Sequence, residues 1–176
     1  MRKACLAVLF LSIVLFAAAV PAQAQGGTAI TRLRGFEEVP ATSTPGGGFF
    51  SATISEDGTH VDWELSYFNI EGNVTQAHLH FAQRSVNGGI VVFLCSNLTG
   101  AQAPPPGTQP CPTKSGTIHG TFTAANILAV NNQSVAAGDL ASFLRGIRAG
   151  VVYANVHTDQ LPGGSIRGQL IFTPSD

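Results

Sequence analysis

The strongest constraint on the fold is a regular alternation of apolar and polar residues next to a turn-forming dipeptide. Between His60 and Tyr67, the odd positions hold Val, Trp, Leu and Tyr, and the even positions hold His, Asp, Glu and Ser. Side chains two residues apart share one face of a strand, so this pattern predicts a strand with one buried and one wet face. A shorter apolar run precedes it over residues 49–54, and Asp57-Gly58 between the two runs predicts a β-hairpin.

Similar short runs, separated by glycine, proline and asparagine, continue along the chain. We expect strands over residues 29–33, 49–54, 60–68, 74–81, 90–95, 116–122, 151–157 and 165–172, the last two forming a hairpin. One segment has a helical period instead, because apolar residues recur at three- and four-residue spacing between Asp139 and Gly150. Asp139 suits the start of that helix and Gly150 its end. The sequence therefore predicts an all-β, antiparallel Greek-key β-sandwich with one short helix.

The first 24 residues have the pattern of an export signal. Arg2 and Lys3 precede an apolar run over residues 4–20, and Ala22-Gln23-Ala24 offers the small residues that a signal peptidase accepts. The run is shorter than the roughly 20 residues of a membrane-spanning helix, so we expect cleavage rather than anchoring. The domain then comprises residues 25–176, in which no stretch reaches membrane length, and the protein is expected to be secreted or exposed at the cell envelope.

Charge and motifs exclude several functional classes. Nine Lys and Arg residues against ten Asp and Glu residues give a formal net charge of −1 without a basic block, which argues against a nucleic-acid partner. The sequence contains neither G-x-S-x-G nor H-E-x-x-H, and no glycine-rich phosphate loop opens the predicted helix. No catalytic residue is therefore predicted.

Removal of the export signal leaves two cysteines, Cys95 and Cys111. The segment between them is rich in proline and lacks apolar periodicity, which is typical of a loop. An even number of cysteines in an exported chain favours a structural disulfide. We therefore expect Cys95 and Cys111 to be joined across this loop.

The histidines provide the one chemical lead. His78-Leu79-His80 places two imidazoles on the same face of a predicted strand, and His157 lies on a strand near the other end of the chain. If the two strands are neighbours, three imidazoles converge in a manner that suits copper or zinc, with His119 or Asp159 as a candidate fourth ligand. The alternative is that hydrogen bonds within the sandwich satisfy these rings and no metal binds.

Arg167 lies within a predicted apolar strand, which is an unusual place for a guanidinium group. A buried arginine requires a fixed acceptor, and Glu38, Glu37 and Asp159 are the candidates. We expect Arg167 and Glu38 to have a structural role as a fold-specifying ion pair.

Four phrases of the sequence resemble one known family. They are LRGFEEVP at 33–40, AHLH at 77–80, NVHT at 155–158 and PGGSIRGQL at 162–170. Their order and spacing are similar to those of the CHRD domain, a module named from chordin and found in many exported microbial proteins. The resemblance covers roughly residues 31–172. It implies an extracellular β-sandwich, either immunoglobulin-like or distantly similar to copper–zinc superoxide dismutase, whose metal site also begins with H-x-H.

Three functions are compatible with these observations. The first is a non-enzymatic structural or binding module, whose protein or envelope partner the sequence does not identify. The second is a copper- or zinc-binding protein that uses His78, His80 and His157. The third is an enzyme similar to superoxide dismutase, which the motifs support least. An exposed apolar patch would favour the first, and converging imidazoles would favour the second.

Overall fold

The structure is a computed structural model that describes residues 26–176. Its strands are β1 (Gly27–Arg34), β2 (Gly47–Ile54), β3 (His60–Phe68), β4 (Val74–Phe81), β5 (Gly89–Ser96), β6 (Gly116–Thr123), β7 (Val152–Thr158), β8 (Ile166–Gln169) and β9 (Ile171–Pro174). One α-helix, α1 (Leu140–Arg148), accompanies four 3-10 turns at Gly35–Glu37, Gly100–Gln102, Ala124–Asn126 and Asn131–Gln133. The predicted export signal lies outside the described residues. Within them, no helix is long and apolar enough to span a membrane.

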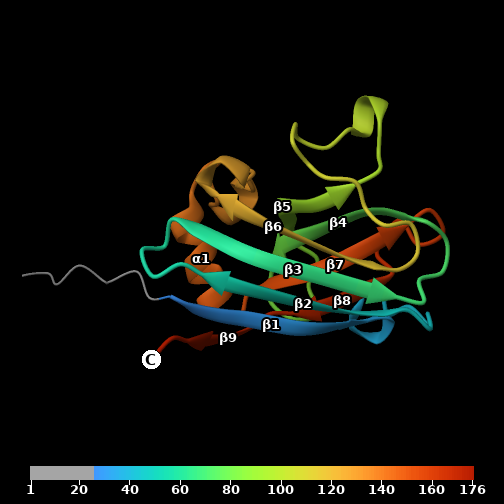
Figure 1. Cartoon of the computed structure of the whole chain (residues 1–176), viewed down its shortest axis with the longest axis horizontal. Coiled ribbons are helices and arrows are strands. Elements are labelled where there is room, and N and C mark those ends of the chain that lie inside the picture. The colour runs from blue at the N-terminus through green and yellow to red at the C-terminus, as the bar shows by residue number, and fades with distance from the viewer. Residues whose placement is uncertain (1–25) are drawn as a thin grey trace, which may run out of the picture.

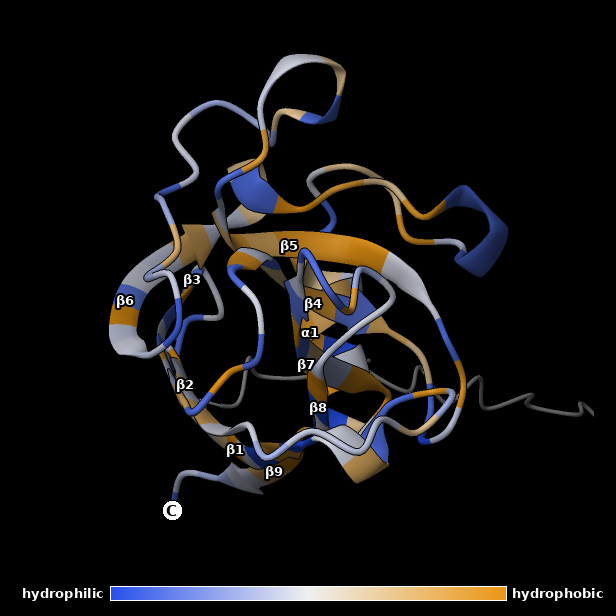
Figure 2. Ribbon diagram, turned by 90° about the vertical axis from the view of Figure 1, so that its right-hand side faces the viewer, coloured by the Kyte–Doolittle hydropathy of each residue, from blue (hydrophilic) through white to orange (hydrophobic). Residues whose placement is uncertain are grey.

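All strands belong to one antiparallel sheet with the order β5-β4-β7-β8-β1-β2-β3-β6, and β9 pairs with β1. The sheet curls so that its two edge strands, β5 and β6, approach each other (Figures 1 and 2). The result is a nearly closed barrel, and the predicted all-β antiparallel fold with one helix is confirmed. Pairing of β4 with β7 brings together segments from the middle and the end of the chain.

The last predicted strand divides into two. Residues 166–169 pair with β7 on one side, and Arg167 pairs with Arg34 of β1 on the other, whereas residues 171–174 pair with β1 alone. The division falls at Leu170, which is buried and whose backbone N–H donates to the carbonyl of Val152 at 2.9 Å. The predicted strand over 165–172 is therefore interrupted at Leu170, where pairing with β7 ends while pairing with β1 continues in the same register.

The helix α1 closes one end of the barrel (Figure 2). Asp139 caps its first turn by accepting a hydrogen bond from the backbone N–H of Ser142, and Gly150 follows its end with a φ of 70°. Both termini agree with the prediction. The apolar face of α1 joins the main core, where the ring of Phe143 lies 5.9 Å from that of Phe122.

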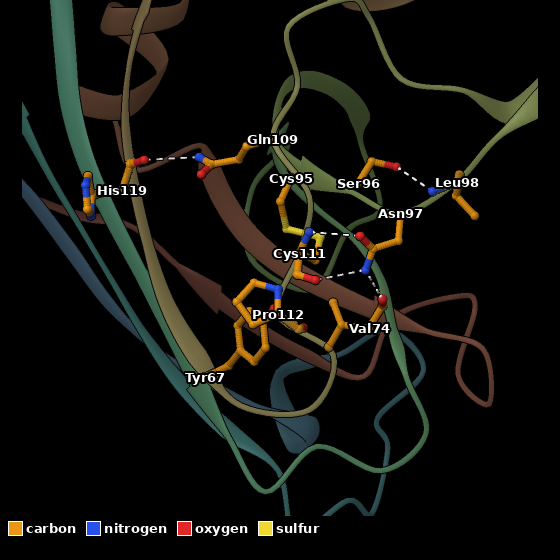
Figure 3. The surroundings of a disulfide bond; sticks show 10 residues. All are labelled: Tyr67, Val74, Cys95, Ser96, Asn97, Leu98, Gln109, Cys111, Pro112 and His119. Atoms are coloured by element: carbon orange, nitrogen blue, oxygen red, sulfur yellow. Dashed lines mark hydrogen bonds between the residues drawn. A yellow bond between two sulfur atoms is a disulfide. The ribbon is translucent and has the colours of Figure 1, made fainter.

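The predicted disulfide joins Cys95 on β5 to Cys111 at the end of the proline-rich loop (Figure 3). Asn97 reinforces the junction. Its side chain donates to the carbonyls of Val74 and Cys111 and accepts a hydrogen bond from the N–H of Cys111. The loop projects from the barrel (yellow-green in Figure 1), but its base is thereby fixed to β4 and β5. A disulfide is consistent with an oxidising compartment.

The two halves of the sheet have different outer faces. Over β9, β1, β2 and β3, the exposed large apolar side chains are Ile30, Phe49, Phe68 and Ile171. Over β4, β7 and β8, the outer face is buried and polar. There the side chains of His78, His80, Tyr153, Asn155, His157, Arg167 and Gln169 form a layer, hereafter the polar layer. The polar layer lies on the opposite face of the sheet from the apolar core, because successive residues of a strand point to opposite faces.

Candidate metal centre

Three histidines of the polar layer converge. His78 and His80 are two residues apart on β4, and His157 lies on the adjacent strand β7, where the register pairs His78 with Asn155. One ring nitrogen from each histidine lies within 4.8 Å of the others. The ring of His78 lies 5.1 Å from that of His157 and 5.4 Å from that of His80. The strand pairing that the sequence left open therefore does bring the three imidazoles together.

All three rings are buried, with exposed fractions of 0% for His78 and 7% each for His80 and His157. Burial disfavours the charged imidazolium and lowers the pKa of His78 to about 2 and that of His80 to about 4. It also lowers the pKa of His157. The rings are therefore neutral at neutral pH, which is the protonation state that a metal ligand requires.

Two of the rings have their tautomer set by the backbone. Nδ1 of His80 lies 3.0 Å from the carbonyl oxygen of Gly88, and Nδ1 of His157 lies 2.9 Å from that of Pro162. A carbonyl oxygen can only accept, so each Nδ1 carries the hydrogen and each neutral ring keeps a lone pair on Nε2. Donation of one ring N–H to a backbone carbonyl is also the usual arrangement of histidines that bind metal through the other nitrogen.

His78 is the most unusual of the three. It is completely buried, and neither ring nitrogen has a hydrogen-bond partner among the described residues. The nearest aromatic ring, that of Phe93, is nearly perpendicular to the imidazole, with ring centres 4.4 Å apart, and it offers no hydrogen-bond acceptor. Buried polar atoms without partners are rare in proteins, so this ring calls for a ligand that the chain itself does not supply.

Asn155 lies between the other two rings. Its Oδ1 atom is 3.0 Å from Nε2 of His80 and 3.0 Å from Nε2 of His157. The same side chain faces the carboxylate of Glu38 and helps to lower its pKa; Glu38 is a buried residue that follows the 3-10 turn after β1. Burial raises the pKa of Glu38 to about 7, although the charge of Arg167 and the hydrogen bond from Asn155 oppose this effect. Glu38 thus belongs to the surroundings of the histidine cluster.

Arg167 finds other partners than the sequence suggested. Its guanidinium donates to the carbonyl of Val86 at 2.8 Å and to Oδ1 of Asn87 at 3.1 Å, and it lies over the ring of Tyr153. Within residues 26–176, no carboxylate forms a direct ion pair with it. Glu38 acts on Arg167 through its charge without such a contact, and Glu37 pairs with Arg84 instead. One backbone carbonyl and one side-chain amide oxygen of the loop between β4 and β5 accept from the buried guanidinium in place of an acid.

The residues named as a candidate fourth ligand lie elsewhere. His119 is exposed on β6, the edge strand at the far end of the sheet order from β4 and β5. The carboxylate of Asp159 accepts two hydrogen bonds from Asn73 at the surface. Neither belongs to the cluster of three histidines. Sequence reasoning overlooked Asn155 as a contact of the rings, although its spacing of two from His157 places it on the same face of β7.

The family model of the CHRD domain matches residues 29–170, a span that begins in β1 and ends at Leu170, before β9. No curated protein and no solved structure matches the chain. The matched span contains all three histidines, Asn155, Glu38 and Arg167. The chain belongs to the CHRD-domain family.

Proposed function

We propose that this protein is an exported, non-enzymatic CHRD-domain module that binds one copper or zinc ion through His78, His80 and His157. The export pattern of residues 1–24 and the disulfide between Cys95 and Cys111 support a location outside the cytoplasm. Membership of the CHRD family supports a non-enzymatic module. The partner of such a module is not identified by these features.

The observation that carries metal binding is the unsatisfied state of His78. A completely buried imidazole without a hydrogen bond destabilises a fold unless something else occupies its lone pair. The lone pairs of His80 and His157 point to the same region, because backbone carbonyls hold their Nδ1 hydrogens. Imidazole nitrogen is a preferred ligand of both copper and zinc.

Calorimetric titration of metal-free protein, residues 25–176, with Cu(II) and with Zn(II) tests this proposal. The proposal expects one ion per chain. The His78→Ala/His80→Ala double variant should lose this binding. The His60→Ala/His119→Ala double variant is the matched control, because it removes two imidazoles that lie outside the cluster and should bind as the parent does.

Binding that is absent in the parent, or unchanged in the His78→Ala/His80→Ala variant, overturns the proposal. Binding that the His60→Ala/His119→Ala variant loses instead would place the metal elsewhere on the chain. Circular dichroism of each metal-free variant separates a lost ligand from a lost fold.

A further inference from the structure

In the orientation that the structure shows, the polar groups around the three histidines do not all satisfy one another. Each Nδ1 of His80 and His157 donates to a carbonyl, so both Nε2 atoms of the neutral rings can only accept. Yet Oδ1 of Asn155, which is also only an acceptor, lies 3.0 Å from each of them. Three acceptor atoms therefore face one another with no hydrogen between them.

Turning the amide of Asn155 does not remove the conflict while Glu38 is ionised, which is its state above its pKa of about 7. Its nitrogen would then face the two rings, but its oxygen would face the carboxylate of Glu38, whose pKa the amide nitrogen helps to lower in the observed orientation. A cation among the three acceptor atoms satisfies both rings and the amide oxygen at once. The rings and the amide oxygen direct lone pairs at the cation, and the amide nitrogen still faces the carboxylate of Glu38.

We propose that Oδ1 of Asn155 is the fourth ligand of the metal ion and that Glu38 holds the amide in the orientation that presents this oxygen. This inference rests on the proposed function, since it concerns the same site. In a tetrahedral site with bonds of 2.0–2.1 Å, ligand atoms are about 3.3–3.4 Å apart. The observed separations of 3.0 Å between Oδ1 and each Nε2 are close to that spacing. Neutral imidazole and amide oxygen together form a mixed N and O ligand set that suits zinc and copper.

Glu38 fits the role of a positioning residue. It is buried, and Gly164 approaches it so closely that a Cβ at residue 164 would lie 2.5 Å from Oε1 of Glu38. The carboxylate is therefore confined by the backbone of the turn that follows His157. A carboxylate confined in this way can orient the amide of Asn155 before the metal binds. Residues that contact a metal ligand without touching the ion commonly have this orienting role.

Asn155→Leu and Asn155→Asp, each loaded with Zn(II) and separately with Co(II), test the proposal. Asn155→Leu retains the approximate shape without an oxygen and should weaken Zn(II) binding on the order of 10- to 100-fold. It should also shift the visible absorption bands of Co(II), because one ligand is replaced. Asn155→Asp keeps an oxygen, should retain binding and should likewise shift the Co(II) bands. Asn132→Leu, at an exposed asparagine outside the polar layer, is the control and should change neither quantity.

Glu38→Gln and Glu38→Leu test the positioning role. Glutamine keeps an acceptor for the amide of Asn155 and should preserve both the affinity and the Co(II) spectrum, whereas leucine should weaken binding. Unchanged affinity and an unchanged Co(II) spectrum in Asn155→Leu overturn the fourth ligand while leaving the three-histidine site intact. If Asn155→Leu does not fold, an unchanged Co(II) spectrum in Asn155→Asp overturns it equally. Failure of the parent to bind metal overturns the proposed function instead.

Discussion

The guanidinium carbon of Arg167 lies 3.4 Å from the centre of the Tyr153 ring. Tyr153 is in turn stacked on His80, with ring centres 4.7 Å apart and planes inclined by 1°. The strand of Tyr153 lies between those of the other two residues in the sheet. Arg167 therefore contacts the histidine cluster through an aromatic ring, and its cation is held beside the cluster by the Val86 carbonyl rather than by an acid.

Arg167→Ala should destabilise the domain by about 3 kcal/mol, because hydrogen bonds to a charged donor and a desolvated cation–π contact are lost together. Arg167→Lys should recover little of this loss, since an ammonium group cannot both stack on Tyr153 and reach the two acceptors on Val86 and Asn87. Urea denaturation measures both effects. The matched control is Arg34→Ala, at an exposed arginine that pairs with Arg167 in the sheet register. Equal losses in the two alanine variants would contradict the structural role.

Gly164→Ala should be severely destabilising, and Gly163→Ala should not. Gly164 has a φ of 134°, and a Cβ there would lie 2.5–2.6 Å from the carboxylate of Glu38. At Gly163 a Cβ would meet no atom within 4 Å. We expect a loss above about 2 kcal/mol for the first variant and below about 1 kcal/mol for the second. Thermal denaturation of the Gly164→Ala and Gly163→Ala variants compares the two positions directly. Similar melting temperatures would show that Glu38 is not confined as described.

Removal of the disulfide should weaken the fold without changing it. A loop of this length is stabilised by roughly 3 kcal/mol when its ends are joined, so Cys95→Ala/Cys111→Ala should unfold at lower urea concentration. The hydrogen bonds of Asn97 to the loop base persist in that variant and limit the structural change. Thiol titration of the denatured, non-reduced protein of residues 25–176 is the companion measurement. Two free thiols would show that the bond does not form.

Much of the fold could be predicted because local patterns specify it. The bounds of β3 and β4 coincide with the predicted strands, and the capping residues of α1 were recognisable from their chemistry. Pairing between distant strands leaves no such local signal. The end of the pairing with β7 at Leu170 therefore went unrecognised, because residues on both sides of it are compatible with a single strand.

The candidate site, too, could be predicted only in part. His78 and His80 were recognisable from their spacing of two on one strand, and their convergence with His157 depends on the pairing of β4 with β7. The contact between Asn155 and Glu38 depends on a loop that crosses from β1 to the outer face of β7, and no periodicity encodes that crossing. Metal binding itself stays a prediction.

Alkaline pH should destabilise the domain through Tyr67. Its hydroxyl is buried, donates to the carbonyl of Pro112 at 2.6 Å, and has a pKa that burial raises well above its usual value (Figure 3). Below about pH 10 the phenol is protonated in both the folded and the unfolded chain, so it adds no pH dependence. Above about pH 10 the unfolded chain releases the proton and the folded one does not, so stability should fall as pH rises.

Denaturation midpoints between pH 7 and pH 11 measure this slope. Tyr67→Phe should start about 1 kcal/mol less stable, because the carbonyl of Pro112 loses its donor, and should decline less steeply above pH 10. Identical slopes in the parent and Tyr67→Phe would show that the hydroxyl ionises freely in the folded protein.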